Sequence, residues 1–200
     1  MKLGEIKIEA LKLMFASYER DFSVSDLNVD AASDTYRDYL INMPGAINRA
    51  FAIIENKGVL PVKRYEIKDT KVTKVDMSVV EDFFSVERVI FEGAHGEYVP
   101  QYPYLLEGTV IRFPDTLADG EKYTVLYRPR INRVTDNAED VDVPDNIAVY
   151  IPYFIKGELY REEQPGEASE AHNLFMKALD ELIPEKAGGG SVTTVFGIRW

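Results

Sequence analysis

The chain has 200 residues, no cysteine and a formal net charge of −11 at pH 7. A chain of this length buries roughly 70 % of the surface that it exposes when unfolded, so it can form a sizeable core without disulfides. The missing cysteines exclude disulfide frameworks, thiolate zinc sites, iron–sulfur clusters and cysteine nucleophiles together. The acidic balance disfavours sequence-specific binding of DNA or RNA, since such proteins present a basic face to the phosphates.

The N-terminal sequence and the hydropathy of the chain bear on its location. Charged residues break every apolar run within residues 1–9, so the core of a signal peptide is missing there. No stretch of the sequence approaches the ~20 apolar residues that span a membrane. We therefore expect a soluble protein that is made in the cytoplasm and does not enter a membrane.

The first third of the chain shows the periodicity of amphipathic helices. We expect one helix over residues 4–20 and a second that begins near Ser33 and ends near Asn56. Pro44 interrupts the second segment. Because proline removes a backbone donor and clashes with the preceding turn, we expect either a sharp kink or two helices there.

After Val59 the apolar period changes to about two, and β-branched and aromatic residues dominate, which is typical of short strands. The predicted strands cover residues 65–67, 71–73, 83–91, 98–99, 102–106, 109–113 and 122–131. Asp119 and Gly120 separate the last two as a hairpin turn does. The last strand alternates, with Tyr123, Val125 and Tyr127 on one face and Lys122, Thr124, Arg128 and Arg130 on the other, so we expect it to be half-buried.

Helical periodicity returns near residue 142. Pro144 suits the first turn of a helix, and the neighbouring carboxylates suit its N-terminus. Pro152 lies inside this predicted helix and should bend it. A last helix has an apolar face from Ala168 to Leu182. Because the link between them is short, we expect these two helices to be antiparallel neighbours. The fold class is therefore α+β, with helices from both chain ends flanking a block of antiparallel strands.

The C-terminal tail joins an apolar segment to the last helix through Gly188–Gly190. Three glycines form a flexible joint, and Val195, Phe196 and Trp200 make the segment after it apolar and similar to a strand. Such a segment either docks on its own domain or adds a strand to a neighbouring molecule. Val195, Phe196 and Trp200 are therefore candidate residues of a subunit interface.

Charged residues are unevenly distributed. Residues 134–170 contain ten acidic residues against Lys156 and Arg161. The simplest interpretation is a solvated loop and an exposed helix face. Arg128, Arg130 and Arg133 form a basic stripe at the end of a strand. The stripe either pairs with acidic groups of its own molecule or meets the acidic region of a neighbour, as a head-to-tail subunit contact requires.

No catalytic pattern is present in the sequence. His95 and His172 have no metal-binding spacing, and the nucleophile-elbow, phosphate-loop and dinucleotide-loop motifs are missing. We expect no catalytic residues, no cofactor and no metal, hence a non-enzymatic protein. Two alternatives stay open. One is a sugar- or calcium-binding β-sandwich module that uses the acidic residues 136–145, and the other is an acid-dependent hydrolase.

Two segments resemble the head-tail adaptor and neck proteins of tailed bacteriophages and prophages, including the adaptors similar to tail tubular protein A. The first is residues 39–50, Tyr-Leu-Ile-Asn-Met-Pro-Gly-Ala-Ile-Asn-Arg-Ala. The second and stronger one is residues 143–163, in which a proline-started helix ends in Leu159-Tyr160-Arg161-Glu162-Glu163, followed by the helix that contains Phe175. The resemblance covers about half of the chain.

The resemblance implies a virion structural protein with no catalytic residues. Its fold would be a helical bundle of residues 1–60 and 142–187, an inserted antiparallel β-sandwich lobe of residues 61–141, and a joint and tail of residues 188–200. Its subunits would form a homo-oligomeric ring in the virion, between the portal and the tail or stopper proteins. DNA would pass through the bore without sequence-specific binding. An acidic face would repel the DNA phosphates, and its candidate residues are Asp136, Glu139, Asp140, Asp142, Glu162 and Glu163.

Overall fold

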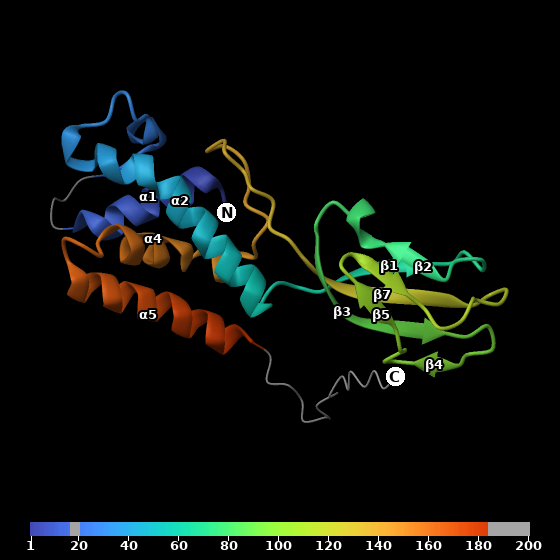
Figure 1. Cartoon of the computed structure of the whole chain (residues 1–200). Coiled ribbons are helices and arrows are strands. Elements are labelled where there is room, and N and C mark those ends of the chain that lie inside the picture. The colour runs from blue at the N-terminus through green and yellow to red at the C-terminus, as the bar shows by residue number, and fades with distance from the viewer. Residues whose placement is uncertain (17–20, 184–200) are drawn as a thin grey trace.

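The computed structural model describes residues 1–16 and 21–183. Within them the chain is a mixed α+β protein whose strands form two antiparallel sheets. Figure 1 shows the helices gathered at one end and the strands at the other, joined by the connections 58–62 and 130–144. We refer to these two ends as the helical part and the strand part.

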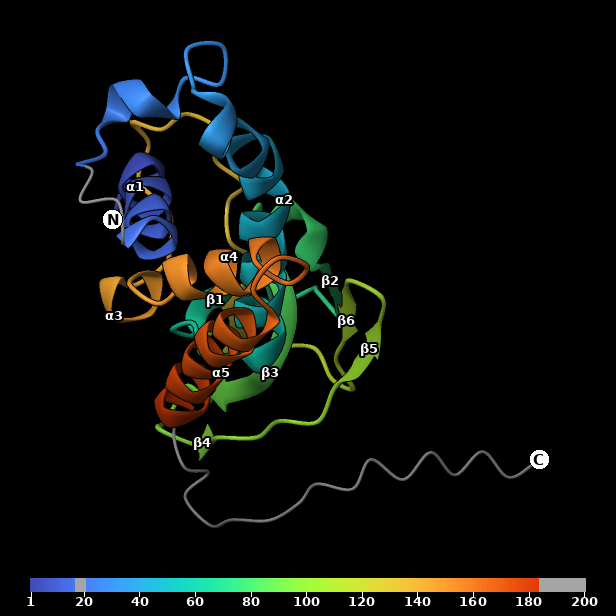
Figure 2. The same cartoon turned by 90° about the vertical axis from the view of Figure 1, so that its left-hand side faces the viewer.

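The helical part is organised around one central helix. Its elements are α1 (Leu3–Met14), the 3-10 helix η2 (Val24–Leu27), α2 (Asp34–Lys57), α3 (Asp145–Ala148), α4 (Ile151–Leu159) and α5 (Pro165–Leu182). Helix α4 packs against α1, α2 and α5, and Figure 2 shows it between α1 and α5. Helices from both ends of the chain are thus in contact, and α4 and α5 are adjacent as expected.

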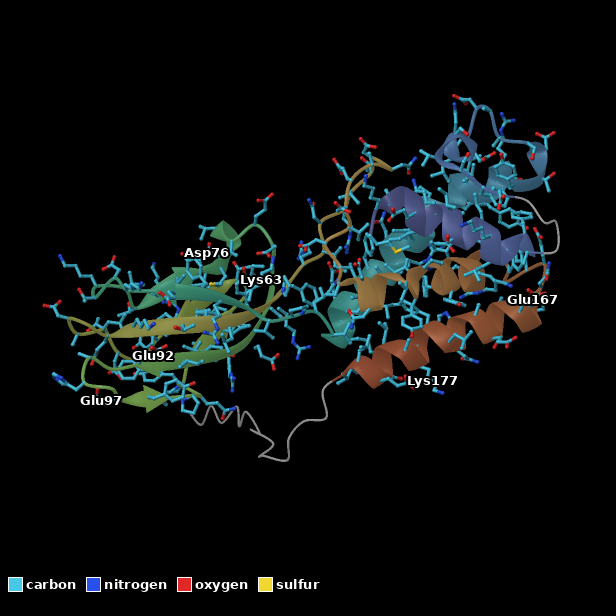
Figure 3. All side chains as sticks on the ribbon, turned by 180° about the vertical axis from the view of Figure 1, so that it is seen from behind. Lys63, Asp76, Glu92, Glu97, Glu167 and Lys177 are labelled. Atoms are coloured by element: carbon cyan, nitrogen blue, oxygen red, sulfur yellow. The ribbon has the colours of Figure 1, made fainter. Side chains whose placement is uncertain are left out.

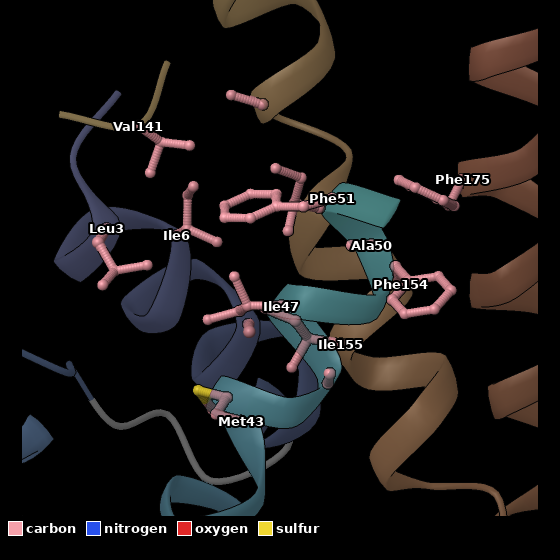
Figure 4. Packing of buried hydrophobic residues seen from close by; sticks show 14 of the residues in the cluster. Leu3, Ile6, Met43, Ile47, Ala50, Phe51, Val141, Phe154, Ile155 and Phe175 are labelled. Carbon is pink, nitrogen blue, oxygen red and sulfur yellow. The ribbon is translucent and has the colours of Figure 1, made fainter. Parts of the chain in front are cut away.

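The core of the helical part draws on segments that are far apart in the sequence. Phe51 of α2, Phe154 of α4 and Phe175 of α5 are each at most 1 % exposed, and the last two have ring centroids 4.9 Å apart. Figure 4 shows Val141, from the connection 130–144, close to Leu3 at the start of α1. Burial of these large side chains is the main stabilising term for the arrangement.

Pro44 does not divide the second helix. Helix α2 is continuous from Asp34 to Lys57 with Pro44 inside it. Met43 and Ile47 on either side are buried while Pro44 itself is exposed. Helical stability in proteins comes mostly from packing of the apolar face, and here that packing outweighs the backbone hydrogen bond that proline removes. Of the two expected outcomes, the division into two separate helices is therefore wrong.

Pro152 does not bend a longer helix, so this prediction is wrong. The chain forms two short helices, because α3 ends at Ala148 and α4 begins at Ile151. Pro152 lies in the first turn of α4, where its missing N–H has no intrahelical acceptor to reach. Helix α1 is also shorter than expected, since it ends at Met14.

The strands form two sheets. One has the order β1–β7–β3–β4 and the other β2–β6–β5. The strands are β1 (Lys63–Ile67), β2 (Lys74–Asp76), β3 (Phe83–Glu92), β4 (Tyr98–Val99), β5 (Leu105–Glu107), β6 (Val110–Arg112) and β7 (Lys122–Pro129), with the 3-10 helix η3 (Met77–Val79) after β2. Both sheets contribute to one apolar cluster, in which Tyr123 and Val125 of β7 meet Ile111 of β6 and Phe113. The Phe113 and Tyr123 rings stack with centroids 4.2 Å apart.

Asp119 and Gly120 do not form a hairpin turn between paired strands, so this prediction is wrong. Strand β6 pairs with β2 and β5, whereas β7 pairs with β1 and β3. The connection crosses from one sheet to the other, and Leu117 within it is buried in the core between them. Gly120 still requires its left-handed backbone, with φ at 85°.

Strand β7 is buried on both faces over its centre, which corrects the half-buried prediction. Tyr123, Val125 and Tyr127 are buried as expected, but Thr124 and Leu126 on the opposite face are also only 4 % and 7 % exposed. Because β7 lies between β1 and β3, side chains of both neighbouring strands flank Thr124 and Leu126 on this face. The Thr124 hydroxyl oxygen is buried without a hydrogen-bond partner among residues 1–16 and 21–183.

Candidate functional site

The basic stripe predicted from the sequence is largely paired within the molecule. The Arg128 Nε atom lies 2.6 Å from the Glu87 Oε2 atom, and the Arg133 Nη2 atom lies 2.8 Å from the Glu55 Oε2 atom. The Arg130 guanidinium lies over the Phe84 ring, 5.9 Å from its centroid. Of the two interpretations open for this stripe, pairing within the chain therefore describes Arg128 and Arg133.

Glu55 links the helical part to the connection that returns from the strands. Its side chain is 6 % exposed, and its two oxygens accept hydrogen bonds from the Ile131 N–H at 2.7 Å and from Arg133 at 2.8 Å. The Arg133 guanidinium also lies 5.2 Å from the centroid of the Phe51 ring. A buried carboxylate requires such partners, so the end of α2 holds the start of the connection 130–144 in place.

Asp82 makes the corresponding junction on the strand side. It accepts hydrogen bonds from Lys63 at 2.6 Å and from the Tyr127 hydroxyl at 2.9 Å, and its backbone carbonyl accepts the Arg130 N–H. Burial raises the pKa of the Asp82 carboxyl, but the hydrogen bonds from Lys63 and Tyr127 outweigh burial and hold this pKa below its usual range. Burial and the hydrogen bond to Asp82 raise the pKa of Tyr127 to about 12. Figure 3 shows Lys63 at the end of the strand part that faces the helices.

The junction surrounds an open polar hollow. Its lining includes Asp82, Arg130, Arg133 and Asp142. Three of these side chains already have partners in the molecule, since Lys63 lies 3.9 Å from Asp142 as well as contacting Asp82. The hollow therefore lies at the junction between the two parts, and its charged side chains mainly hold this junction together.

The acidic residues predicted as one face lie in two separate groups. Asp136, Glu139, Asp140 and Asp142 lie beside the start of α1, where the Leu3 N–H donates to the Glu139 carbonyl at 3.0 Å. Glu162 and Glu163 follow α4. Tyr160, directly after α4, donates its hydroxyl hydrogen bond to the carbonyl of Met14 at the other end of α1. Helix α1 has 12 residues and is therefore about 18 Å long at 1.5 Å per residue. The structure does not bring the two acidic groups together.

A further charged surface, which the sequence reading did not identify, covers the outer face of the first sheet. Arg64 of β1 and Arg88 of β3 flank Leu126 of β7 in one row of the sheet. Both arginines are exposed, and neither forms an ion pair with any residue in the described part of the chain. Arg64 and Arg88 thus form a basic pair on the surface of an acidic protein. Strand pairing creates this surface, so the only signal in the sequence was the alternation within β1 and β3.

At the far end of the same sheet face, the charged side chains are paired with one another. Lys122 lies 3.3 Å from Glu66 and 3.2 Å from Glu92, which join β1, β7 and β3. Lys68 lies 2.8 Å from the other oxygen of Glu66. These ion pairs lower the pKa of Glu66. The hydrogen bond from Lys68 is the largest cause, and the hydrogen bond from Lys122 is the next largest. In contrast to these paired charges, Arg64 and Arg88 on the same face have no ion-pair partner in the described part of the chain.

The histidines lie apart. His95 is exposed in the loop between β3 and β4, and the His172 ring on α5 lies 5.4 Å from the Phe154 ring. Residues 1–16 and 21–183 contain no group of three or more His, Asp or Glu side chains that could hold a metal ion. None of the helices in the described ranges combines the length and apolar composition needed to cross a bilayer. Val195, Phe196 and Trp200 lie outside the described residues.

No protein-family model matches this chain. No curated protein matches it either.

Proposed function

We propose that this chain is a non-enzymatic structural protein of a phage virion, a head-tail connector subunit that assembles into a ring between portal and tail. In this proposal the helical part is a bundle, and the strand part is a β-sandwich lobe inserted into it. The proposal rests on the resemblance of residues 39–50 and 143–163 to head-tail adaptors, together with the arrangement of the two parts.

The observation that supports it most is the way the chain closes on itself. Helices from both ends share one apolar core, and the strands between them have a second core of their own. This arrangement supports the bundle and inserted lobe that the resemblance implies. The helical part contains both chain ends and can serve as a stable base. The strand part is attached to it through two connections, so it can contact a second partner independently.

Charge gives the subunits a way to recognise one another. Arg64 and Arg88 form a basic pair on the strand part, and Asp136, Glu139 and Asp140 form an acidic group on the helical part. A head-to-tail contact joins two different patches, and opposite charges orient it. In the proposed ring, acidic residues that face the bore repel DNA phosphates during passage.

Assembly tests the proposal directly. Sedimentation velocity and negative-stain microscopy of the full chain, alone and with the portal protein of the same phage, should show closed rings. The double variant Arg64→Glu/Arg88→Glu should lower ring formation at least tenfold, whereas Lys74→Glu, an exposed charge reversal on the other sheet, should leave it unchanged. Adding Asp136→Lys and Glu139→Lys to the double variant should restore part of the assembly.

The same samples examine the alternative functions. Calorimetry with calcium chloride and with a panel of glycans measures binding by a sugar- or calcium-binding module. Tight glycan binding by a chain that stays monomeric with the portal protein present would contradict the connector proposal.

A further inference from the structure

One edge of the second sheet exposes two adjacent leucines, where a free strand is normally protected by charge or proline. Edge strands are usually blunted by charge or proline, because their unpaired backbone groups recruit other chains. Strand β1 is Lys-Arg-Tyr-Glu-Ile and β2 is Lys-Val-Asp, and Pro100 follows the two residues of β4. Strand β5 instead reads Leu105-Leu106-Glu107, with the leucines 49 % and 43 % exposed.

The backbone of β5 is available for a further strand. It pairs with β6 on one side, and no backbone hydrogen bond joins residues 105–107 to any other element in the described part of the chain. In an antiparallel ladder the N–H and C=O groups of alternate residues point away from the partner strand. At least one residue of β5 therefore presents both groups outward.

The side chains at this edge extend the core. Leu106 lies directly opposite Ile111 in the β5–β6 pair, so both side chains are on the same face of the sheet. Ile111 is fully buried in the cluster between the sheets, whereas Leu106 is 43 % exposed at the rim. A strand added beyond β5 would cover Leu106 if its inward side chains were apolar.

The C-terminal segment has the sequence of such a strand. Residues 191–200 alternate with a period of two, which places alternate side chains on one face of an extended chain. One set is Val192, Thr194, Phe196, Ile198 and Trp200, and the other is Ser191, Thr193, Val195, Gly197 and Arg199. The first set is apolar or β-branched throughout, and the second is mostly small or polar. The ten residues match one strand with a buried face.

We propose that residues 191–200 of one copy add as a strand to the free edge of β5 in a neighbouring copy. The proposal rests on the proposed ring and adds a second subunit contact to the charged one. A donor segment and an acceptor edge are different surfaces of one chain, so their contact is head-to-tail and propagates around a ring.

Trp200 makes this docking visible in the unmodified protein, because it is the single tryptophan of the chain. Docking of its segment on the strand part of a neighbour should shift its emission to shorter wavelength as protein concentration rises through the assembly range. Leu106→Glu should abolish the shift, and Val79→Glu should retain it, since Val79 is 72 % exposed in η3, which follows the opposite edge strand β2. A shifted emission that is independent of concentration would mean docking within one chain and would overturn the proposal.

Cysteine pairs identify the partner copy, because the natural chain has no cysteine to interfere. A Leu105→Cys chain mixed with a Val195→Cys chain and then oxidised should give a covalent heterodimer, since both side chains lie on the outer face of the extended sheet. A Val79→Cys chain mixed with the Val195→Cys chain is the matched control and should give at least tenfold less heterodimer.

The outcomes separate this inference from the proposed function. Rings that form without the heterodimer leave the connector proposal standing and overturn the strand exchange. A disulfide that forms only within the double variant Leu105→Cys/Val195→Cys, and not between mixed chains, also overturns the exchange. Absence of both rings and heterodimer contradicts the two proposals together.

Discussion

The helical part and the strand part each have an apolar core, but the residues of the two cores are distributed differently along the sequence. The helical core joins Leu3 to Val141 and Phe175, so it needs both ends of the chain. The strand core lies between Ile67 and Tyr127 and is supplied by one continuous stretch. Loss of either chain end therefore removes part of the helical core while it leaves the strand core intact. The difference identifies the helical part as the one that requires the complete chain.

The sharpest test of this comparison is a matched pair of core truncations. Phe175→Ala in the helical part and Phe113→Ala in the strand part should each cost about 3–5 kcal/mol, because both rings are almost fully buried. Thermal unfolding followed by circular dichroism at 222 nm and by amide NMR signals should show each variant destabilising mainly its own part. If both signals shift together in both variants, the two cores unfold as one unit.

The junction should respond to the loss of the buried carboxylate. Glu55→Ala removes the acceptor of the Ile131 N–H and should cost about 1.5–3 kcal/mol. Glu55→Gln keeps one acceptor and loses the pairing with Arg133, which is 37 % exposed, so about 0.5–1 kcal/mol is expected. Hydrogen exchange at the Ile131 amide provides the measurement, since it should accelerate in Glu55→Ala and stay slow in Glu55→Gln. Equal protection in the two variants would show that Glu55 does not hold the connection.

A further comparison uses two glycines with opposite surroundings in the helical part. A Cβ atom at Gly157 would lie 3.0 Å from the Ala168 carbonyl oxygen and 3.1 Å from His172, so Gly157→Ala should separate α4 from α5 and cost about 1–3 kcal/mol. Gly166 has no atom within 4 Å of that position, and Gly166→Ala should gain about 0.5–1 kcal/mol. Urea denaturation measures both, and the same sign for the two variants would contradict the close approach of these helices.

The elements themselves were largely predictable, and the misses have local causes. Helix α2 follows its apolar period through Pro44, because packing of that face was stronger than the local signal. The strand predicted at residues 71–73 comes too early, since β2 begins at Lys74. A strand this short contains too few residues for its periodicity to fix its position. At Asp119 and Gly120 the turn chemistry was right, but turn residues do not specify which strands pair.

The candidate surfaces were less predictable than the elements. The three arginines at the end of β7 formed the obvious stripe in the sequence, yet Glu55 and Glu87 already neutralise two of them. Arg64 and Arg88, which are 24 positions apart in the chain, become a pair only when β1 and β3 flank β7. Ion pairing depends on distances in space, which a count of charges along the chain does not give.

The sequence by itself determined the type and order of the elements, because local periods of 3.6 and two residues decide which face of each segment can be buried. It also determined the alternation of the C-terminal segment, which is a property of neighbouring residues. Only the tertiary structure decided which strands share a sheet, which charges are already paired and which edge remains open. These properties arise from contacts between residues that are distant in the chain, where burial and pairing of one group depend on where every other group has packed.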